Sequence, residues 1–296
     1  MTDIPAVLRN THRVLCFDTE RIFLRGVTNP AYDFIKNSVF SKDCTLSYRL
    51  EDAENIEFSQ IQIGGNSANF LYGIFPNLAF YCDLVEALCK DIGKMGKYHL
   101  LANVPADSDE FSFLKANGFH TYSVQSIRKT LPFNQAGTAS HQWAYAQEED
   151  LRSVISFYTR CISPFEASIQ SWNFSDTFHL ILRATSNEIA GVARVRYFAN
   201  RAVILPLIDS KLVEFHQSLI ALMVEMADIF STIYIREPAN FPLDKTFLEN
   251  HTEACVQEDH YMLRNLVIFN PLKNYQPADL FEERSIPKPT TPYSRP

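Results

Sequence analysis

The chain contains one pattern of elements twice, and this duplication restricts the possible folds more than any other feature. Residues 45–114 align without a gap on residues 179–248, and the identical pairs include Arg49/Arg183 and Asn66/Asn200. Strand-like and helix-like runs follow one another in the same order along both stretches. A repeated order at a fixed offset is typical of a duplicated unit, and 296 residues suffice for two ordinary domains. We therefore predict two similar domains in one chain.

Each copy is predicted to have three strands, a helix, a short buried strand, a second helix and a last strand. Apolar residues that alternate predict the strands, and apolar residues three or four positions apart predict the helices. In the first copy these ranges are 45–51, 56–65, 68–75, 83–96, 98–104 and 121–130, and the second helix contains Phe113. In the second copy they are 178–184, 189–198, 201–209, 214–230, 231–237 and 260–267. More helical segments, 29–39 and 148–162, open the two copies. The pattern predicts an α/β (α+β) fold, with mixed, mostly antiparallel sheets flanked by helices.

We place the first domain at residues 1–132, the second at 141–268 and a C-terminal tail at 269–296. The segment 131–141 is rich in Gly, Ala, Ser and Thr and has no apolar period, which is typical of a linker. From residue 270 onward the chain holds six of its 15 prolines. Proline is excluded from helix interiors and central strands, so we expect an extended tail.

Composition argues against one class of partner. Hydrophobic residues make up 46 % of the chain and charged residues 21 %, which is enough apolar material for sizeable cores. The net charge of −7 argues against nucleic acid, because binding to phosphates requires clustered Lys and Arg. The nearest basic cluster, Arg194, Arg196 and Arg201, is too small to change this expectation.

We expect neither a membrane span nor a metal site. No run of 18 apolar residues occurs, and the N-terminus lacks the apolar core of a signal peptide. The six cysteines are scattered without a C-x-x-C pair, as is typical of reduced thiols. His251, Cys255 and His260 lie close together in sequence, but no second cluster completes a four-ligand zinc site; we interpret them as polar residues that flank a strand. These features predict a cytoplasmic protein.

One short motif points to a family. The predicted helix before the last strand of the first copy reads FLKANGF (113–119), so Gly118 can take the left-handed conformation that ends many helices. With this motif, the order of elements resembles the GNAT superfamily of acyl-CoA-dependent N-acyltransferases, and the two copies resemble its tandem members. The resemblance implies a GNAT-like fold for each copy, with Phe119 buried under the sheet. It also implies acetyl-CoA or another acyl-CoA as cofactor, and a small-molecule or peptide amine as acceptor.

The loop that binds the CoA pyrophosphate in this family is altered in both copies. The family places glycines there because backbone N–H groups must approach the phosphates closely. The matching loops read PNLAFYCD (76–83) and KLVEFHQS (211–218). Tyr81 would obstruct a phosphate, and Glu214 would also repel it. Lys211 is the cation that remains, and its alternative role is that of an ordinary surface lysine.

The expected acid and base are also missing. The family's general acid is often a Tyr on the helix before Gly-Phe, and the matching positions hold Phe113 and Phe247. A carboxylate on the fourth strand would be the base, and Asp209 is the candidate; its alternative role is the N-cap of the following helix. The catalytic residues are therefore unassigned.

The family also binds the acyl-pantetheine arm through exposed backbone between its splayed fourth and fifth strands. The matching segments are Leu205–Leu207 and Leu71–Gly73. Asn103 ends the fifth strand of the first copy, where the family often turns a polar group toward CoA; its alternative role is a turn residue before Val-Pro. The cofactor contacts that the resemblance implies are Leu205, Leu207, Ser210, Lys211 and Asn103.

Two functions remain open. The first is an acyl-CoA-dependent N-acyltransferase acting on an unidentified amine, in which one copy works through backbone contacts and Lys211. Its catalysis would consist mainly of orienting the amine toward the thioester. The second is a non-catalytic GNAT-like scaffold whose clefts bind a ligand or partner. The missing glycines and the two phenylalanines at the acid positions favour the second on mechanism, whereas the resemblance favours the first, because most members of the family are enzymes and many vary these motifs.

Overall fold

The structure is a computed structural model that describes residues 14–25, 45–51, 56–75, 83–132, 143–169, 177–211, 213–238 and 241–266. The first half of the chain forms the elements that its pattern predicts. Its strands are β2 (Thr45–Glu51), β3 (Ile56–Ile63), β4 (Ser67–Ile74), β5 (His99–Pro105) and β6 (His120–Thr130). Its helices are α4 (Asp83–Lys94) and α5 (Asp109–Ala116).

The second half repeats this order. Its strands are β8 (Thr177–Arg183), β9 (Ile189–Phe198), β10 (Arg201–Ile208), β11 (Thr232–Pro238) and β12 (Thr252–Asn265). Its helices are α8 (Phe215–Ala227) and α9 (Lys245–His251). Before them come β7 (Trp143–Tyr145), η2 (Glu148–Asp150), α6 (Leu151–Cys161) and α7 (Pro164–Ile169). The offset found in the sequence carries β4 onto β10 residue for residue, and the predicted α/β class is confirmed.

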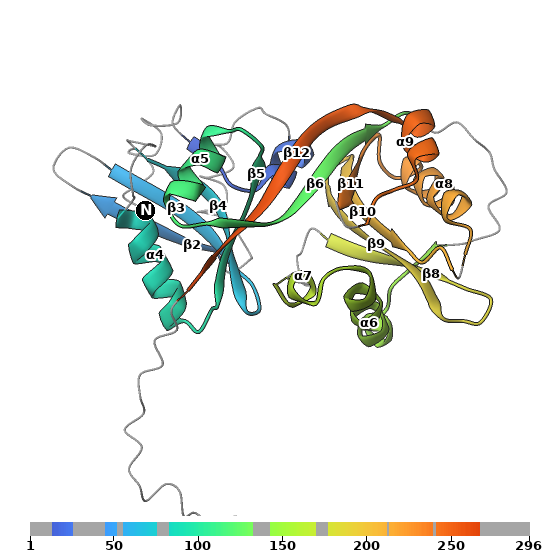
Figure 1. Cartoon of the computed structure of the whole chain (residues 1–296), viewed down its shortest axis with the longest axis horizontal. Coiled ribbons are helices and arrows are strands. Elements are labelled where there is room, and N and C mark those ends of the chain that lie inside the picture. Colours follow the sequence, from blue (N-terminus) through green and yellow to red (C-terminus); the bar gives the residue numbers. More distant parts are fainter. Residues whose placement is uncertain are drawn as a thin grey trace, which may run out of the picture.

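All these strands belong to one mixed sheet. Their order is β2-β3-β4-β5-β12-β6-β11-β10-β9-β8-β7. The last strands of the two halves are exchanged: β12 lies between β5 and β6, and β6 lies between β12 and β11. Figure 1 shows these two long strands crossing from one half of the molecule to the other. The domain limits proposed from the sequence remain a prediction. In the observed strand order, the sheet of each half includes a strand that belongs to the other half of the sequence.

A parallel pair of strands in each half separates part of the way along. In the first half, β4 and β5 pair from Ser67↔His99 to Asn69↔Leu101, and both strands then continue. In the second half, β10 and β11 pair from Arg201↔Thr232 to Ile204↔Ile235, and both again continue. Each half therefore has an opening between its two parallel strands.

An N-terminal segment that the sequence pattern did not predict enters the first opening. It consists of the short strand β1 (Val14–Cys16) and the helix α2 (Thr19–Arg25). β1 pairs antiparallel with β4, and Asp18 makes a parallel bridge to Asn103 on β5. The N-terminal segment thus acts as an extra strand between β4 and β5.

Each half has its own apolar core beneath the sheet. In the first half, the buried face of α4 packs with Phe17, Phe70 and Phe113, and Phe119 is buried as expected. Gly118 has a φ of 77°, so the predicted left-handed end of the helix before β6 is confirmed. In the second half, Phe247 and the buried face of α8 form the corresponding core.

Three local expectations were wrong. β12 begins at Thr252, directly after α9, so Cys255 and His260 lie inside the strand rather than beside it. Asn103 lies within β5 and is buried, so it is not a turn residue. Asp209 does not cap α8, because the N-cap residue of that helix is Glu214.

Several predictions concern residues outside the described ones. They are the opening helix at 29–39, most of the loop 76–83, most of the linker 131–141 and the tail 269–296. Within the described ranges, no helix is long and apolar enough to cross a membrane.

Candidate functional site

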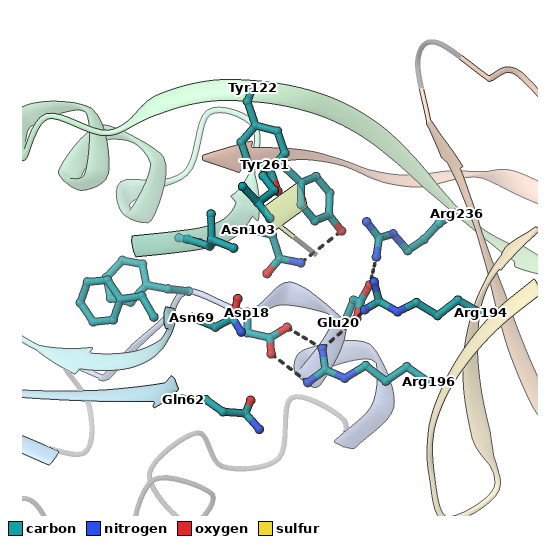
Figure 2. A pocket seen from close by; sticks show the side chains of 15 residues that line it. Asp18, Glu20, Gln62, Asn69, Asn103, Tyr122, Arg194, Arg196, Arg236 and Tyr261 are labelled. Atoms are coloured by element: carbon teal, nitrogen blue, oxygen red, sulfur yellow. Dashed lines mark hydrogen bonds and ion pairs between the residues drawn. The ribbon is translucent and has the colours of Figure 1, made fainter. Parts of the chain in front are cut away.

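A pocket of about 80 Å³ lies where the two halves meet (Figure 2). The N-terminal segment contributes its floor, β5, β6 and β12 contribute one wall, and β9 and β11 contribute the opposite wall. Its polar side chains are Asp18, Glu20, Gln62, Asn69, Asn103, Tyr122, Arg194, Arg196, Arg236 and Tyr261. Its apolar side chains come mainly from the first half, so the pocket has an apolar side and a side rich in arginine.

Arginines of the second half bind the two acids of the N-terminal segment. Arg196 donates to Glu20 Oε2 from Nη1 at 2.7 Å, and to Asp18 Oδ2 from Nη2 at 3.0 Å. Arg236 forms a further ion pair with Glu20, and Arg194 lies 3.7 Å from the same carboxylate. Figure 2 shows these arginines pointing from β9 and β11 toward α2. The N-terminal segment therefore connects both halves, by strand pairing in one and by ion pairs in the other.

These charges are buried, so their pairing decides whether the arrangement is stable. Asp18 is 8 % exposed, Glu20 2 % and Arg196 7 %. Burial acts to raise the pKa of Asp18, but the guanidinium groups of Arg196 and Arg21 outweigh it and hold that pKa well below its usual range. Asp18 therefore stays ionised at neutral pH. A buried ion pair of this kind becomes strongly destabilising when one partner is removed.

Asn103 fixes the N-terminal segment to β5. Its Oδ1 accepts from the Thr19 backbone N–H at 2.8 Å, and its own backbone N–H donates to the Phe17 carbonyl at 2.9 Å. On the other side, the Phe17 N–H donates to the Leu71 carbonyl of β4 at 2.9 Å. The backbone edges that the family resemblance assigns to an acyl-pantetheine arm are therefore used here by the chain itself. The first opening has no room for a ligand strand while this segment is in place.

The second opening has a different lining. Asp209 N–H donates to the Ala190 carbonyl of β9 at 2.8 Å. Because successive residues of a strand turn their backbone groups to opposite sides, Pro206 and Ile208 face away from β9, toward the opening. Proline has no N–H, so at Pro206 the strand presents only a carbonyl acceptor. Among the described strands, only β9 and β11 pair with β10.

A turn leads from this opening into α8. Asp209 Oδ1 accepts from the Lys211 backbone N–H at 3.0 Å, and the Val213 N–H lies 3.3 Å from the Asp209 carbonyl. Glu214 then occupies the N-cap position without a side-chain capping bond. Two carboxylates therefore lie at the turn where the resemblance would put a pyrophosphate.

The structure separates the five predicted cofactor contacts. Leu205 and Leu207 lie on β10, with side chains buried in a cluster that includes Phe157 and Val192. Ser210 and Lys211 are exposed on the turn that follows. Asn103 lies in the other half and lines the central pocket. Because backbone groups alternate between the two sides of a strand, Leu205 and Leu207 turn theirs to β9, so the edge of β10 at the opening belongs to Pro206 and Ile208 instead. Ser210 and Lys211 remain predictions for this site, whereas the observed contacts of Asn103 are with the N-terminal segment and Tyr261.

The two positions of the family's acid are core positions. Phe113 and Phe247 are both fully buried, each in the core of its own half. Neither side chain can transfer a proton, which agrees with the absence of a sequence-based catalytic assignment. Among the described residues no group of three or more His, Cys, Asp and Glu could hold a metal ion. The described cysteines, Cys16, Cys89, Cys161 and Cys255, are free thiols.

Sequence reasoning missed the central pocket. Arg194 and Arg196 form a small basic cluster in the sequence, and their spacing on a strand puts both on one face. Two arginines on one face of an otherwise apolar strand require acidic partners when that face is buried, so this pattern could have indicated a buried charged site. The partners, Asp18 and Glu20, lie in a segment for which no element had been predicted.

Comparison with known proteins identifies no family for the chain. No family model matches it, and no curated protein matches it. Solved structures do match at low identity. A GCN5-related N-acetyltransferase from Sphaerobacter thermophilus is 10 % identical and has a TM-score of 0.48, with 89 % of this chain and 93 % of that one covered.

Two further matches are of the same kind. A GCN5-related N-acetyltransferase from Kribbella flavida is 14 % identical, with a TM-score of 0.49 and coverage of 90 % and 69 %. A tandem GNAT protein from the clavulanic acid biosynthesis pathway is 10 % identical, with a TM-score of 0.47 and coverage of 89 % and 95 %. A TM-score below 0.5 gives such a likeness no weight, so the proposals below depend on the chain's own residues.

Proposed function

We propose that the chain is an acyl-CoA-dependent N-acyltransferase whose thioester site lies in the second half, at the opening between β10 and β11. The observation that carries this proposal is the register of the two strands. Their pairing ends at Ile204↔Ile235, while β10 runs on to Ile208 with one backbone edge turned toward the opening. The GNAT-like order of elements in the sequence supports the same location.

The edge of β10 beyond Ile204, which is not paired with β11, suits an extended amide-containing ligand. The carbonyl of Pro206 faces the opening, and no backbone N–H accompanies it. The pantetheine arm of CoA carries two amides, and an amide N–H of that arm can donate to this carbonyl. Lys211 lies on the turn that follows, with an exposed side chain that forms no ion pair within the described part of the chain. Lys211 lies shortly before α8 in the sequence, so its ammonium group can contact a phosphate that is bound at the start of that helix.

Catalysis at this site would depend on orientation. The amine nitrogen attacks the thioester carbonyl carbon, the carbon–sulfur bond breaks, and the proton that the amine loses ends on the departing thiolate by way of water. Phe247 provides no acid, and Asp209 already accepts from Lys211 N–H. Holding the amine against the thioester converts a bimolecular step into an intramolecular one, which can supply a large part of a rate enhancement.

A second candidate is a non-catalytic protein that binds an acyl-CoA or another ligand. The carboxylates of Asp209 and Glu214 favour it, because both put negative charge at the start of α8, where a pyrophosphate would otherwise gain from the helix N-terminus.

Isothermal titration of acetyl-CoA, CoA and desulfo-CoA into the full chain tests the shared part of both candidates. We expect binding in the micromolar range that weakens at least tenfold in Lys211→Glu. Lys94→Glu, on α4 of the first half, is the matched control and should leave binding unchanged, because its ammonium contacts Asp91 far from β10 in sequence.

Thiol release then separates the two candidates. If a mixture of primary amines speeds release of CoA from acetyl-CoA, the chain is an acyltransferase. If the cofactor binds without release for any amine class, the non-catalytic candidate holds. Absence of heat and of a thermal shift at millimolar CoA would overturn the acyltransferase and leave a protein that binds another ligand.

A further inference from the structure

Every carboxylate oxygen of the two acids in the central pocket has a guanidinium partner. Both oxygens of Asp18 accept from Arg196, and Oδ2 also accepts from Arg21 Nε at 2.9 Å. Both oxygens of Glu20 are in ion pairs, one with Arg196 and one with Arg236. The carboxylates of the N-terminal segment are therefore fully engaged by guanidinium groups.

Several donors in the same pocket are unused. Arg236 is 3 % exposed, and its Nε has no hydrogen-bond partner in the described part of the chain. Tyr261 accepts from Asn103 Nδ2 at 3.2 Å, which leaves its own O–H free to donate. The hydroxyl of Tyr122 has no hydrogen bond to any of the described residues. A buried donor without an acceptor costs free energy, and this applies to Arg236 Nε, so a ligand that brings an acceptor to this group would be stabilised.

The geometry brings these donors together on one side. Figure 2 shows Arg236 pointing from β11 toward Tyr261 and Glu20, with Tyr122 and Tyr261 above Asn103. The Arg236 guanidinium carbon lies 4.5 Å from the centre of the Tyr261 ring, and the two tyrosine rings are 6.2 Å apart. Burial raises the pKa of both phenols, so both keep their protons and remain donors at neutral pH.

The wall carries an excess of guanidinium groups over carboxylates. Arg194, Arg196 and Arg236 line the pocket, against Asp18 and Glu20. Two further buried acids reduce the local positive charge, because Asp259 is close enough to interact with Arg236, and Glu166 with Tyr122. The pocket should therefore prefer a ligand with hydrogen-bond acceptors mainly because of its three unused donors, Arg236 Nε and the hydroxyls of Tyr122 and Tyr261. Its net charge contributes less. A charged donor of this kind forms its strongest hydrogen bonds with a carboxylate.

The opposite side of the pocket is apolar and close. Phe17 and Phe70 line it and are almost fully buried, whereas the other apolar lining residues, Leu101 and Ile169, pack beside Tyr122. A cavity of about 80 Å³ has room for a molecule of only a few heavy atoms, far below the usual size of a cofactor site. The space therefore suits a polar head beside the arginines and a short alkyl group beside the phenylalanines.

We infer that the central pocket binds a short-chain aliphatic monocarboxylate, with its carboxylate against Arg236 Nε and the hydroxyls of Tyr122 and Tyr261, and its alkyl group against Phe17 and Phe70. This site is separate from the proposed acyl-CoA site at β10, because none of the residues that line it belongs to β10 or to the turn at 209–214. Either proposal can fail without the other.

Saturation-transfer NMR on the full chain, at constant ionic strength, provides the test. Acetate, propionate and butyrate should show saturable binding, and octanoate should bind more weakly because the cavity is small. Propionamide has the same shape without the charge, and propylammonium has the opposite charge; both should bind at least tenfold more weakly than propionate. Inorganic phosphate, which lacks the alkyl group, should not compete with propionate.

Tyr122→Phe is the deciding variant. It removes a hydroxyl that holds no part of the described structure, so the fold should be preserved, and propionate should bind about tenfold more weakly. Tyr145→Phe, on the exposed edge strand β7, should bind like the parent protein. No saturable signal from any of the three acids would overturn the inference. Equal affinity for propionamide and propionate would overturn it as well, and so would unchanged binding in Tyr122→Phe.

Discussion

Asn103 holds Thr19 at two points: its Oδ1 accepts from the Thr19 backbone N–H at 2.8 Å, and its carbonyl accepts from Thr19 Oγ1 at 2.9 Å. Both residues are buried, and they lie 84 positions apart in the chain. This contact fixes the first turn of α2 to β5. It thereby holds the neighbouring acids, Asp18 and Glu20, where they bind the arginines of the second half. The stability of the centre should therefore depend on Asn103.

Asn103→Ala should lower the free energy of unfolding by about 1–3 kcal/mol, because the Thr19 N–H is left buried without an acceptor. Urea denaturation measures the change. Asn265→Ala is the matched control: Asn265 is exposed and its Oδ1 lies 3.0 Å from His99 Nδ1, so the cost should stay within about 0.5 kcal/mol. Equal denaturation midpoints for the two variants would contradict the role given to Asn103.

Arg196→Met should be among the most destabilising single changes, at about 3–5 kcal/mol. The methionine fills similar space, but the carboxylates of Asp18 and Glu20 lose their shared partner inside the protein. Arg183→Met removes a pair with Asp150 whose arginine is 39 % exposed, and such a pair contributes at most about 1 kcal/mol. Adding Asp18→Asn to Arg196→Met should recover part of the loss, and a strictly additive double variant would argue against the pairing.

Asp259→Asn should stabilise the protein increasingly as the pH rises from 4 to 7. Burial raises the pKa of Asp259 to about 6, above its ordinary value of 3.8. Between these values the folded state holds more protons than the unfolded state, so stability falls as the pH rises through this window. The asparagine cannot ionise, and it keeps an oxygen for Gln257 Nε2. Its advantage at pH 7 should be on the order of 3 kcal/mol.

Urea denaturation of parent and Asp259→Asn at pH 4, 5, 6 and 7 checks this. Asp18 titrates in the opposite sense, because its folded pKa is lowered and its contribution is lost toward acid pH. That contribution is common to both proteins and largely cancels in the difference. A difference between the proteins that does not change with pH would show that Asp259 is not the group responsible.

Cys16 should report whether the N-terminal segment is in place. It is 5 % exposed, and burial raises its pKa to about 12, whereas Cys255 is exposed. Since the thiolate is the reactive form, iodoacetamide near neutral pH should modify Cys255 first and Cys16 slowly, as peptide mass mapping would show. In Asn103→Ala, modification of Cys16 should become about tenfold faster, because the segment opens more often.

Cys89 on α4 is the internal control for that experiment. It is 7 % exposed, and burial likewise raises its pKa to about 12. Its rate should not change in Asn103→Ala if the opening is local. If Cys16 and Cys89 accelerate together, the whole first half is unfolding, and local release of the segment is ruled out.

Local patterns were enough to predict most elements, and long-range pairing was not. Gly118 shows the first case: its left-handed φ follows from the requirement that a helix ends just before Phe119. β6 and β12 show the second case. Their alternating residues predict strands, but alternation says nothing about which strand lies alongside, and both are exchanged between the halves.

The central pocket escaped prediction for the same reason. Arg196 and Asp18 are 178 positions apart. The residues around each of them in the sequence do not indicate that the two form an ion pair. The side chain of Asn103 was expected to face a cofactor, but a piece of the chain itself occupies that place. The predicted contacts of Ser210 and Lys211 with a cofactor remain predictions, and titration with CoA tests them.

The exchange of β6 and β12 has a consequence for how the protein is made. β5 and β6 are synthesised early, yet the strand that lies between them ends at Asn265. During translation the edges of these two strands stay unsatisfied until nearly the whole described chain has left the ribosome, and such edges are where nascent chains aggregate. A nonsense mutation between residues 132 and 252 would therefore leave β5 and β6 without the strand that lies between them, although every residue of the first half would still be encoded.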